Sequence, residues 1–308
     1  MPYDVPDQQG RRFIVTGANS GTGREAARRL AASGAEVVLA VRSVAKGEEA
    51  AAAIGRESPQ ARLEVRRLDL ADLASVREFA DGITADGRPL HALVNNAGLM
   101  FPPERYATAD GFELQIGTNF FGPFALTNLL LPLLLETPGA RVVNMSSGAA
   151  NAGRIDFDDL TGMSKRYSKY GAYARSKLAN LLHGRRLAAM AEERGWPLLS
   201  VMAHPGYTRT NLQTAAKNLA RDPGDPLPPI TRTILPSQGV ETGTEPLLFA
   251  AASPEAEQGA FYGPRWLLVG PAATSPVPRQ AKSKETAERL WAEAERLTDT
   301  SAPALQGG

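Results

Sequence analysis

Residues 12–23 read RFIVTGANSGTG, an apolar run that passes into a glycine-rich turn. The apolar part, residues 12–17, predicts a buried strand, and a helix is predicted from about Gly21 to Ser33. Glycine permits positive φ and lets a phosphate approach the chain closely, and a helix N-terminus offers unpaired N–H groups and a positive dipole end. A glycine-rich turn between a strand and a helix therefore predicts a phosphate-binding site.

The rest of the chain alternates strand-like runs with longer helical patterns. Further strands are predicted at residues 35–42, 61–70, 91–98, 140–147 and 197–206. This alternation predicts an α/β fold in which helices cover both faces of a parallel sheet. The carboxyl ends of the strands then share one edge, where open α/β sheets bind ligands. Polar motifs follow several of these strands, so we expect the functional site at that edge.

The composition excludes several kinds of site and partner. The 308 residues contain no cysteine, which rules out disulfides, thiolate metal sites and a cysteine nucleophile. The three histidines, His91, His183 and His204, lie far apart in the sequence, so we expect no metal site. The 34 basic and 33 acidic side chains give a net charge of +1, which offers no reason to expect a nucleic-acid partner.

We expect neither a signal peptide nor a membrane span. The first ten residues, MPYDVPDQQG, lack a basic region followed by an apolar one. The most apolar segment, residues 120–135, is shorter than the ~20 residues of a membrane-spanning helix, and Asn128 and Pro132 interrupt it. It is interpreted as a buried helix of a soluble, cytoplasmic protein.

A tyrosine and a lysine lie one helical turn apart in GAYARSKLAN, residues 171–180. Tyr173 and Lys177 are four positions apart, so the phenol and the ammonium share one helix face and can approach the same point. Taken alone, the pair suits either an amphipathic surface helix or an acid with a tuned pKa.

Six motifs carry a family resemblance. In chain order they are the glycine spacing GxxxGxG (Gly17, Gly21, Gly23), NNAG (95–98), NFFG (119–122), NMSS (144–147), YARSK (173–177) and HPGYTRT (204–210). From about residue 10 to 270 the sequence resembles the short-chain dehydrogenase/reductase family. FDDL (157–160) and SKLANLL (176–182) resemble its branch of retinol dehydrogenases and protochlorophyllide reductases.

The resemblance implies a Rossmann-type α/β fold with a doubly wound parallel sheet. We expect a single catalytic domain over residues 1–298, with a lid insertion over the active site at about 207–236. Residues 299–308 are expected to be a disordered tail. Homodimers and homotetramers are common in the family, but the sequence leaves the oligomeric state open.

The resemblance assigns four catalytic positions, Asn119, Ser147, Tyr173 and Lys177. It implies that Tyr173 protonates a carbonyl oxygen to which Ser147 donates a hydrogen bond. Lys177, together with the positively charged nicotinamide of the oxidised cofactor, is expected to lower the pKa of the phenol. Lys177 is also expected to bind the ribose hydroxyls of the cofactor. Asn119 is expected to hold a water that relays protons to Lys177, or else to be a structural amide that bends a helix. Ser146 competes with Ser147 for the serine role.

The expected cofactor is NADP(H). An NAD site usually places a carboxylate about 20 residues beyond the glycines, but that region reads LAVRS here, with Ala40 in the acidic position and Arg42 nearby. A guanidinium binds a 2′-phosphate that a carboxylate would repel, although Arg42 also suits a solvated strand end. Arg24 and Lys46 would add positive potential. The residues expected to bind the cofactor are Gly17, Asn19, Ser20, Gly21, Thr22, Gly23, Arg42, Asp69, Leu70, Asn96, Ala97, Gly98, Tyr173, Lys177, Pro205, Gly206 and Thr208.

Two of these cofactor positions carry alternatives. Asp69 suits a contact with the adenine, a helix N-cap or both. Thr22 departs from the family pattern, because an aliphatic residue commonly stands between the last two glycines.

The expected reaction interconverts a carbonyl and a primary or secondary alcohol. Met100, Phe101 and Tyr106 predict one wall of a pocket for a bulky hydrophobic substrate, with apolar residues of the lid opposite. The lid residues are Leu212, Leu219, Leu227, Ile230, Ile234 and Leu235, which equally suit packing of the lid on the body. Reduction of a C=C bond on the same scaffold is the alternative enzyme, and a non-catalytic NADP-binding regulator is the alternative class.

Overall fold

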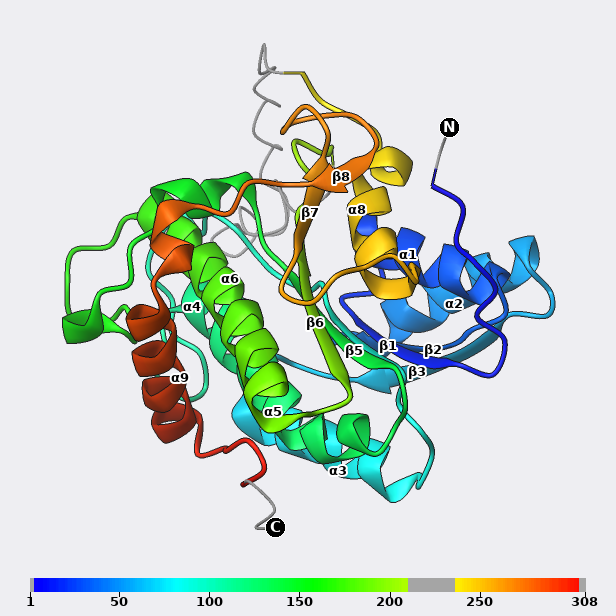
Figure 1. The fold of residues 1–308 in the computed structure, drawn as a ribbon, viewed down its shortest axis with the longest axis horizontal. Helices are drawn as coiled ribbons and strands as arrows, with labels where there is room; N and C mark the ends of the chain where they lie inside the picture. The colour runs from blue at the N-terminus through cyan, green and yellow to red at the C-terminus, as the bar shows by residue number, and fades with distance from the viewer. Residues whose placement is uncertain (1–2, 210–235, 305–308) are drawn as a thin grey trace.

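Eight strands form one sheet at the centre of the protein (Figure 1). The structure is a computed structural model that describes residues 3–209 and 236–304. The strands are β1 (Arg12–Thr16), β2 (Glu36–Val41), β3 (Arg62–Arg67), β4 (Ala92–Asn95), β5 (Ala140–Met145), β6 (Leu198–Ala203), β7 (Phe261–Pro264) and β8 (Ala272–Thr274). They pair in the order β3-β2-β1-β4-β5-β6-β7-β8, and every pair is parallel except β7 with β8.

Helices follow most of the strands. The α-helices are α1 (Gly21–Ala32), α2 (Val44–Glu57), α3 (Leu73–Ala85), α4 (Leu114–Ile116), α5 (Gly122–Leu135), α6 (Lys169–Arg194), α8 (Val240–Ala252) and α9 (Lys284–Thr298). A π-helical turn, η1 (Gly117–Phe121), joins α4 to α5. Short 3₁₀ turns are η2 (Gly148–Ala152), η3 (Phe157–Asp159) and η5 (Arg279–Lys282).

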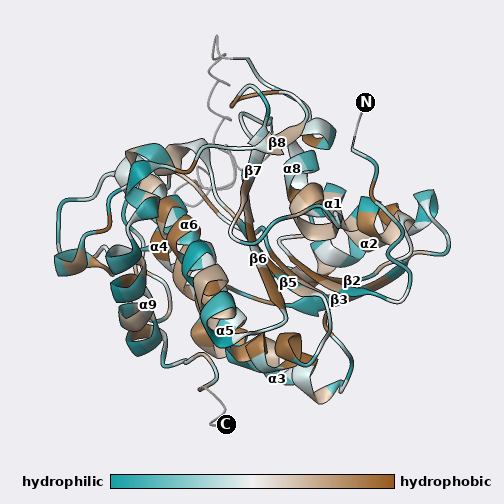
Figure 2. Ribbon diagram, viewed as in Figure 1, coloured by the Kyte–Doolittle hydropathy of each residue, from teal (hydrophilic) through white to brown (hydrophobic). Residues whose placement is uncertain are grey.

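The sheet separates two apolar cores (Figure 2). Successive side chains of a strand point to opposite faces, so Ile14 of β1 enters one core while Phe13 and Val15 enter the other. Helices α1, α2 and α8 cover the face of Phe13, and α3, α5, α6 and α9 cover the face of Ile14. A sheet buried on both faces is the doubly wound arrangement that the sequence predicts, so the predicted fold class is confirmed.

The winding reverses between β1 and β4, which are neighbours in the sheet. In open α/β sheets such a reversal leaves a crevice at the carboxyl ends of the strands. The glycine turn follows β1 and the NNAG motif ends β4, so both lie at this crevice. The topology therefore brings together motifs about 80 residues apart.

The end of the chain differs from the prediction of a tail that is disordered from residue 299. Thr300 is buried and its hydroxyl is 2.8 Å from that of Thr298, and the backbone N–H of Ala302 donates to Glu295 of α9 at 2.9 Å. Residues 299–304 thus pack on the body because α9 supplies hydrogen-bond partners. Residues 305–308 lie outside the described residues.

The predicted lid is described only at its two ends, because residues 210–235 lie outside the described residues. Thr208 and Gln238 form a parallel bridge, and the N–H of Arg209 donates to the carbonyl of Gln238 at 3.1 Å. The Gln238 side chain also donates to the carbonyl of Pro205 at 3.0 Å. The insertion therefore leaves and rejoins the body at one place.

The apolar segment forms a longer helix than predicted, because α4, η1 and α5 run on as Leu114–Leu135, 22 residues. By length and composition alone this helix is long and apolar enough to cross a membrane. However, 72% of its most apolar stretch is buried inside the fold. Phe120, Phe121 and Phe124 are among the largest fully buried side chains.

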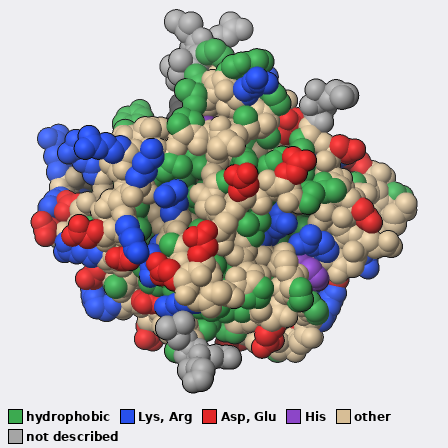
Figure 3. Space-filling view, viewed as in Figure 1, with side chains coloured by type: hydrophobic (Ala, Val, Ile, Leu, Met, Phe, Trp, Pro, Cys, Tyr) green, Lys and Arg blue, Asp and Glu red, His purple; other side chains and the backbone are tan. Residues whose placement is uncertain are grey.

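On the face shown in Figure 3, acidic and basic side chains are interspersed.

Candidate active site

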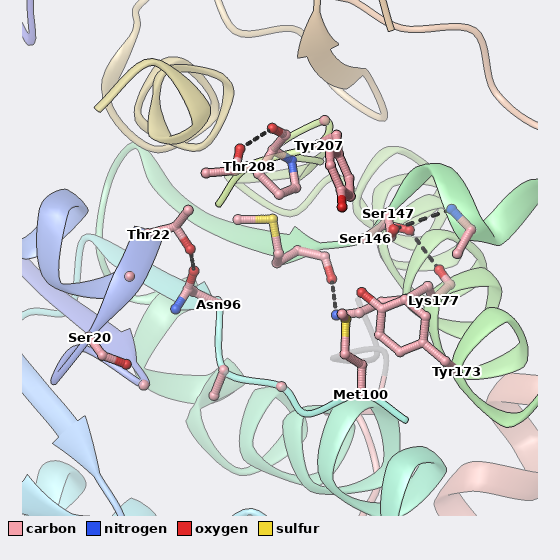
Figure 4. A pocket seen from close by; sticks show the side chains of 18 of the residues that line it. Ser20, Thr22, Asn96, Met100, Ser146, Ser147, Tyr173, Lys177, Tyr207 and Thr208 are labelled. Atoms are coloured by element: carbon pink, nitrogen blue, oxygen red, sulfur yellow. Dashed lines mark hydrogen bonds between the residues drawn. The ribbon is translucent and has the colours of Figure 1, made fainter. Parts of the chain in front are cut away.

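A cavity of about 390 Å³ opens at the carboxyl ends of the strands (Figure 4). Predicted site residues that line it are Gly17, Asn19, Ser20, Gly21, Thr22, Asn96, Ala97, Gly98, Ser147, Tyr173, Lys177, Pro205, Gly206 and Thr208. Met100 and Phe101 of the predicted wall also line it, together with Met145, Ser146, Ala149 and Tyr207. Predicted residues that do not line it are Gly23, Arg42, Asp69, Leu70, Tyr106 and Asn119.

The glycine turn has the conformation that its sequence requires. Gly17 and Gly21 have φ of +68° and +54°, which favours glycine at both positions. The N–H of Gly17 donates to Ala40 of β2 at 2.8 Å, which anchors the turn to the neighbouring strand. A side chain at Gly23 would collide with the carbonyl of Gly17, so glycine is needed there for close packing.

The N-terminus of α1 fits a phosphate. Its N-cap residue, Ser20, makes no side-chain hydrogen bond to the helix, and its first turn has no acidic residue. Its first N–H groups therefore have no capping side chain, and Ser20, Gly21 and Thr22 line the cavity. Thr22, the departure from the family pattern, donates its hydroxyl to Asn96 at 2.8 Å and so ties the glycine turn to the loop after β4.

Tyr173 and Lys177 of α6 both reach the cavity, as the one-turn spacing predicts (Figure 4). Both side chains are buried, and the Lys177 ammonium lies 5.8 Å from the centre of the Tyr173 ring. Lys177 donates to the carbonyl of Met145, at the end of β5, at 3.2 Å. The pair is therefore an enclosed one, and its interpretation as a partly exposed surface pair is wrong.

Burial shifts the pKa values of both members of this pair. Burial raises the pKa of Tyr173, and a hydrogen bond with Ser147 opposes the shift only in part. Burial also lowers the pKa of Lys177 to about 8, because no carboxylate compensates for its lost hydration. Burial is the largest influence on both groups, and a phenol whose pKa is raised keeps its proton at neutral pH.

The two neighbouring serines differ in what they contact. The hydroxyl of Ser146 donates to the backbone carbonyl of Lys177 at 2.7 Å, which fixes the end of β5 against α6. Ser147 lowers the pKa of the Tyr173 phenol, which places its hydroxyl beside that group, and it accepts from the N–H of Ala149 at 3.2 Å. The geometry thus favours Ser147 over Ser146 as the serine beside the phenol.

Asn119 lies in η1, behind the cavity wall. Its amide oxygen accepts from the N–H of Leu99 at 2.8 Å. Its amide nitrogen donates to Leu99 at 3.0 Å and to Ser176 at 2.9 Å. A Cβ placed on Gly98 would lie 3.1 Å from the Asn119 oxygen and 3.4 Å from the Lys177 ammonium, so Gly98 lies between the two. These contacts tie η1 to the loop after β4 and to α6.

The residues expected at the far end of the cofactor lie beyond the cavity. Arg42 is exposed just after β2, two residues beyond the Ala40 that anchors Gly17. Asp69 is half-buried, and its carboxylate accepts from the N–H of Ala71 at 3.0 Å. The N-cap of α3 is Asp72 and not Asp69, so that interpretation of Asp69 is wrong. Leu70 is buried, and its carbonyl oxygen lies close to Gly122. A side chain at position 122 would collide with that oxygen.

His204 holds the loop that closes the other side of the cavity. Its Nδ1 accepts from the N–H of Gly206 at 3.2 Å, and its Nε2 is 2.8 Å from the hydroxyl of Ser275. Gly206 has φ of +62°, and the loop lies so close to Leu268 that a side chain at Gly206 would collide with its carbonyl. Burial lowers the pKa of His204 to about 4, which keeps the ring neutral and Nδ1 available as an acceptor.

The second buried histidine predicts a pH dependence of stability. His183 packs against Phe124 and Trp291, neither ring nitrogen bonds to any described residue, and burial lowers its pKa to about 3. The ring of His183 takes up a proton near pH 6.5 in the unfolded chain but only near about pH 3 in the folded protein. Its contribution to the free energy of unfolding is therefore full above pH 6.5 and is lost as the pH falls toward 3.

The expected slope is about 1.4 kcal/mol per pH unit below pH 6 for each such histidine. His183→Leu should lower the slope of the unfolding free energy against pH by this amount. Urea unfolding at several pH values between about 6 and 5 would measure the change. An unchanged slope in His183→Leu would show that the buried ring is not the source.

Comparisons with known proteins decide the family. A model of short chain dehydrogenases matches residues 11–220. The chain belongs to the short chain dehydrogenase family. It is an oxidoreductase, and members of this family use nicotinamide cofactors.

Two curated relatives illustrate the similarity. Polyprenol dehydrogenase of Mus musculus is 43% identical over 303 residues, covering 96% of this chain and 86% of the relative. Retinol dehydrogenase 12 of Homo sapiens is 47% identical over 203 residues, covering 66% of this chain and 63% of the relative.

Solved structures of this family share the fold. A structure from Mycobacterium paratuberculosis has a TM-score of 0.81 and 41% identity, covering 99% of this chain and all of the other. A short chain dehydrogenase of Shigella flexneri, in complex with NADP, has a TM-score of 0.62 and 25% identity, covering 84% of this chain and 98% of the other.

Proposed function

We propose that this oxidoreductase uses NADP(H) to interconvert a bulky, hydrophobic alcohol and its carbonyl form. The observation that carries the proposal is the buried Tyr173 phenol, which shares one cavity with Ser147, Lys177 and the glycine turn. Such a site can hold a carbonyl oxygen at the phenol while a nucleotide lies along the turn.

In the reduction direction, Tyr173 donates its proton to the carbonyl oxygen as that oxygen gains negative charge. A phenol whose pKa is raised by burial is protonated at neutral pH, which suits this step. Ser147 donates a hydrogen bond to the same oxygen and stabilises the developing charge. The cofactor, when bound, supplies or accepts the hydride.

Lys177 and Asn119 complete the proposed set of catalytic residues. The buried ammonium, whose pKa of about 8 lets it exchange protons near neutral pH, favours the phenolate that remains after proton transfer. We propose that the same ammonium binds the ribose hydroxyls of the cofactor. The proposed role of Asn119 is to hold a relay water beside Lys177, across Gly98.

The preference for NADP(H) rests on charge at the end of β2. Ala40 stands in place of the carboxylate that binds a ribose 2′-hydroxyl, and Arg42 is exposed nearby. The Shigella relative, in complex with NADP, supports the same choice. We propose that Arg42 binds the 2′-phosphate and that Asp69 and Leu70 border the adenine.

The proposed substrate is an extended, apolar alcohol or aldehyde of the isoprenoid type. Met100, Phe101, Met145 and Ala149 give the cavity apolar walls near Tyr173. The relatives named for polyprenol and retinol, which are isoprenoid alcohols, support this class. Reduction of a C=C bond remains the second candidate, because it uses the same tyrosine and cofactor geometry.

A series of aldehydes of increasing apolar area tests the substrate class. We expect kcat/KM to rise with chain length. The corresponding gain in transition-state binding free energy should be at most about 25 cal/mol for each Å² of apolar substrate surface that is buried. The measurement is NADPH oxidation at equal enzyme concentration for aldehydes from propanal to a long isoprenoid aldehyde. If propanal is turned over as efficiently as the longest member, the hydrophobic-substrate proposal fails.

Cytoplasmic location, the absence of a membrane span and assembly as a homodimer or homotetramer also remain proposals. Gel filtration with light scattering, and membrane fractionation of the expressed protein, would test them.

A further inference from the structure

Phe101, in the cavity wall, has an unusual backbone conformation. Its φ is +59°, a left-handed value that is unfavourable for a residue with a side chain. Such strain persists only where surrounding contacts hold it, and it is often found at functional sites. At Phe101 the conformation sets the direction of an aromatic ring beside the phenol.

The ring of Phe101 lies directly against the proposed acid. Its centre is 5.2 Å from that of Tyr173, at an interplanar angle of 70°. It is also 4.6 Å from the centre of Tyr170, the exposed ring at the start of α6. Phe101 and Tyr173 line the same cavity, so a substrate that reacts at the phenol lies close to the Phe101 ring.

A buried amide holds Phe101 in this conformation. The side-chain oxygen of Gln115, in α4, accepts from the backbone N–H of Phe101 at 2.9 Å. Its nitrogen donates to the hydroxyl of Tyr167 at 3.2 Å and to the carbonyl of Lys169 at 3.1 Å. Tyr167 donates in turn to the carbonyl of Pro102 at 3.2 Å.

This network joins the loop after β4 to the segment that begins α6. Gln115 is fully buried and does not line the cavity, so it cannot touch a substrate there. Both hydrogens of its amide are used, and its oxygen bonds to Phe101, the one non-glycine residue with positive φ among the described residues of the cavity wall. Gln115 thus acts on the cavity through Phe101.

We propose that Phe101 determines specificity for large apolar substrates and that Gln115 is the residue that positions it. This inference rests on the proposed function, since it concerns the substrate of that site. The Phe101 ring provides an apolar surface beside the reacting carbon, which favours extended or conjugated carbonyl compounds over small ones. Without the Gln115 oxygen, the loop relaxes to a negative φ and the ring leaves this position.

The test compares kcat/KM for a long isoprenoid aldehyde with that for propanal, expressed as a ratio. Phe101→Gly keeps the backbone conformation without strain and removes the ring, so the ratio should fall by about ten- to a hundredfold. Gln115→Met keeps the volume and removes the hydrogen bonds, and the ratio should fall by about three- to tenfold. In the double variant the ratio should equal that of Phe101→Gly, because no ring remains to be positioned.

Asn128→Met is the matched control, since Asn128 is a buried amide of α5 that bonds to Thr300 and not to the cavity. It should lower Tm without changing the ratio. Tyr167→Phe is the milder second variant, needed if Gln115→Met does not fold. It removes the hydroxyl that bonds to Gln115 and Pro102, so the ratio should fall in the wild-type background and stay constant in the Phe101→Gly background.

An unchanged ratio in Gln115→Met and Tyr167→Phe, with only Tm lowered, would overturn the positioning role. A further fall of the ratio in the double variant would overturn it equally, because Gln115 would then act by another route. An unchanged ratio in Phe101→Gly would overturn the specificity role. If the wild type reduces neither aldehyde, the proposed function itself fails. This result differs from the outcomes above, in which the wild type is active and only the ratios of the variants are in question.

Discussion

Tyr173→Phe is expected to lower kcat for carbonyl reduction by at least ~10²-fold, with nearly unchanged affinity for NADPH. The substitution removes one hydroxyl from a buried ring that packs against Phe101, so the cavity keeps its shape. The loss should appear in kcat because proton donation occurs only in the transition state. Steady-state kinetics and NADPH fluorescence titration measure the two quantities.

Lys177→Ala provides the contrasting case. Lysine is proposed both to favour the phenolate and to bind the ribose, so its removal should impair turnover and cofactor affinity together. If Tyr173→Phe retains near-normal turnover, the phenol is not the proton donor and the proposed mechanism is wrong.

Arg42→Asp is expected to weaken NADPH binding on the order of 100-fold while NADH binding stays within a few fold. The change turns attraction for the 2′-phosphate into repulsion, and an aspartate beyond β2 resembles the acid of NAD sites. Fluorescence titration with both cofactors measures the change, and the effect should shrink as salt is added.

Arg56→Asp is the control for net charge, because Arg56 is an exposed arginine at the other end of α2. It should leave the affinity for both cofactors unchanged. Equal NADPH affinity in Arg42→Asp and the wild type would show that another group determines the cofactor preference.

The fold could be predicted from the sequence where the pattern is local. The first six strands and the helix from Gly21 were predicted to within a few residues. All of these strands except β3 are buried on both faces and read as apolar runs, whereas β3 (RLEVRR) is only partly buried. Strands β7 and β8 were not predicted. They are short, contain Gly263 and Pro264, and pair antiparallel at the edge of the sheet, so they lack this signal.

The candidate site could be predicted wherever a motif follows a strand. Interactions between residues that are distant in the sequence were harder to predict. The motif favoured Ser147 with Ser146 as its competitor, and the structural difference between them depends on which hydroxyl meets α6. The direction of the Tyr173 pKa shift depends on burial, which a spacing does not give. Gln115 was missed because its partners at Phe101, Tyr167 and Lys169 are 14, 52 and 54 residues away.

The most direct measurement is the product formed from NADPH and a long, conjugated isoprenoid aldehyde by the purified wild-type enzyme, identified by NMR. We expect NADPH to be consumed and the allylic alcohol to form with its C=C bonds intact, because Tyr173 and Ser147 are proposed to bind a carbonyl oxygen. A saturated aldehyde as product, or no consumption of NADPH with any aldehyde of the series, would contradict the proposed activity.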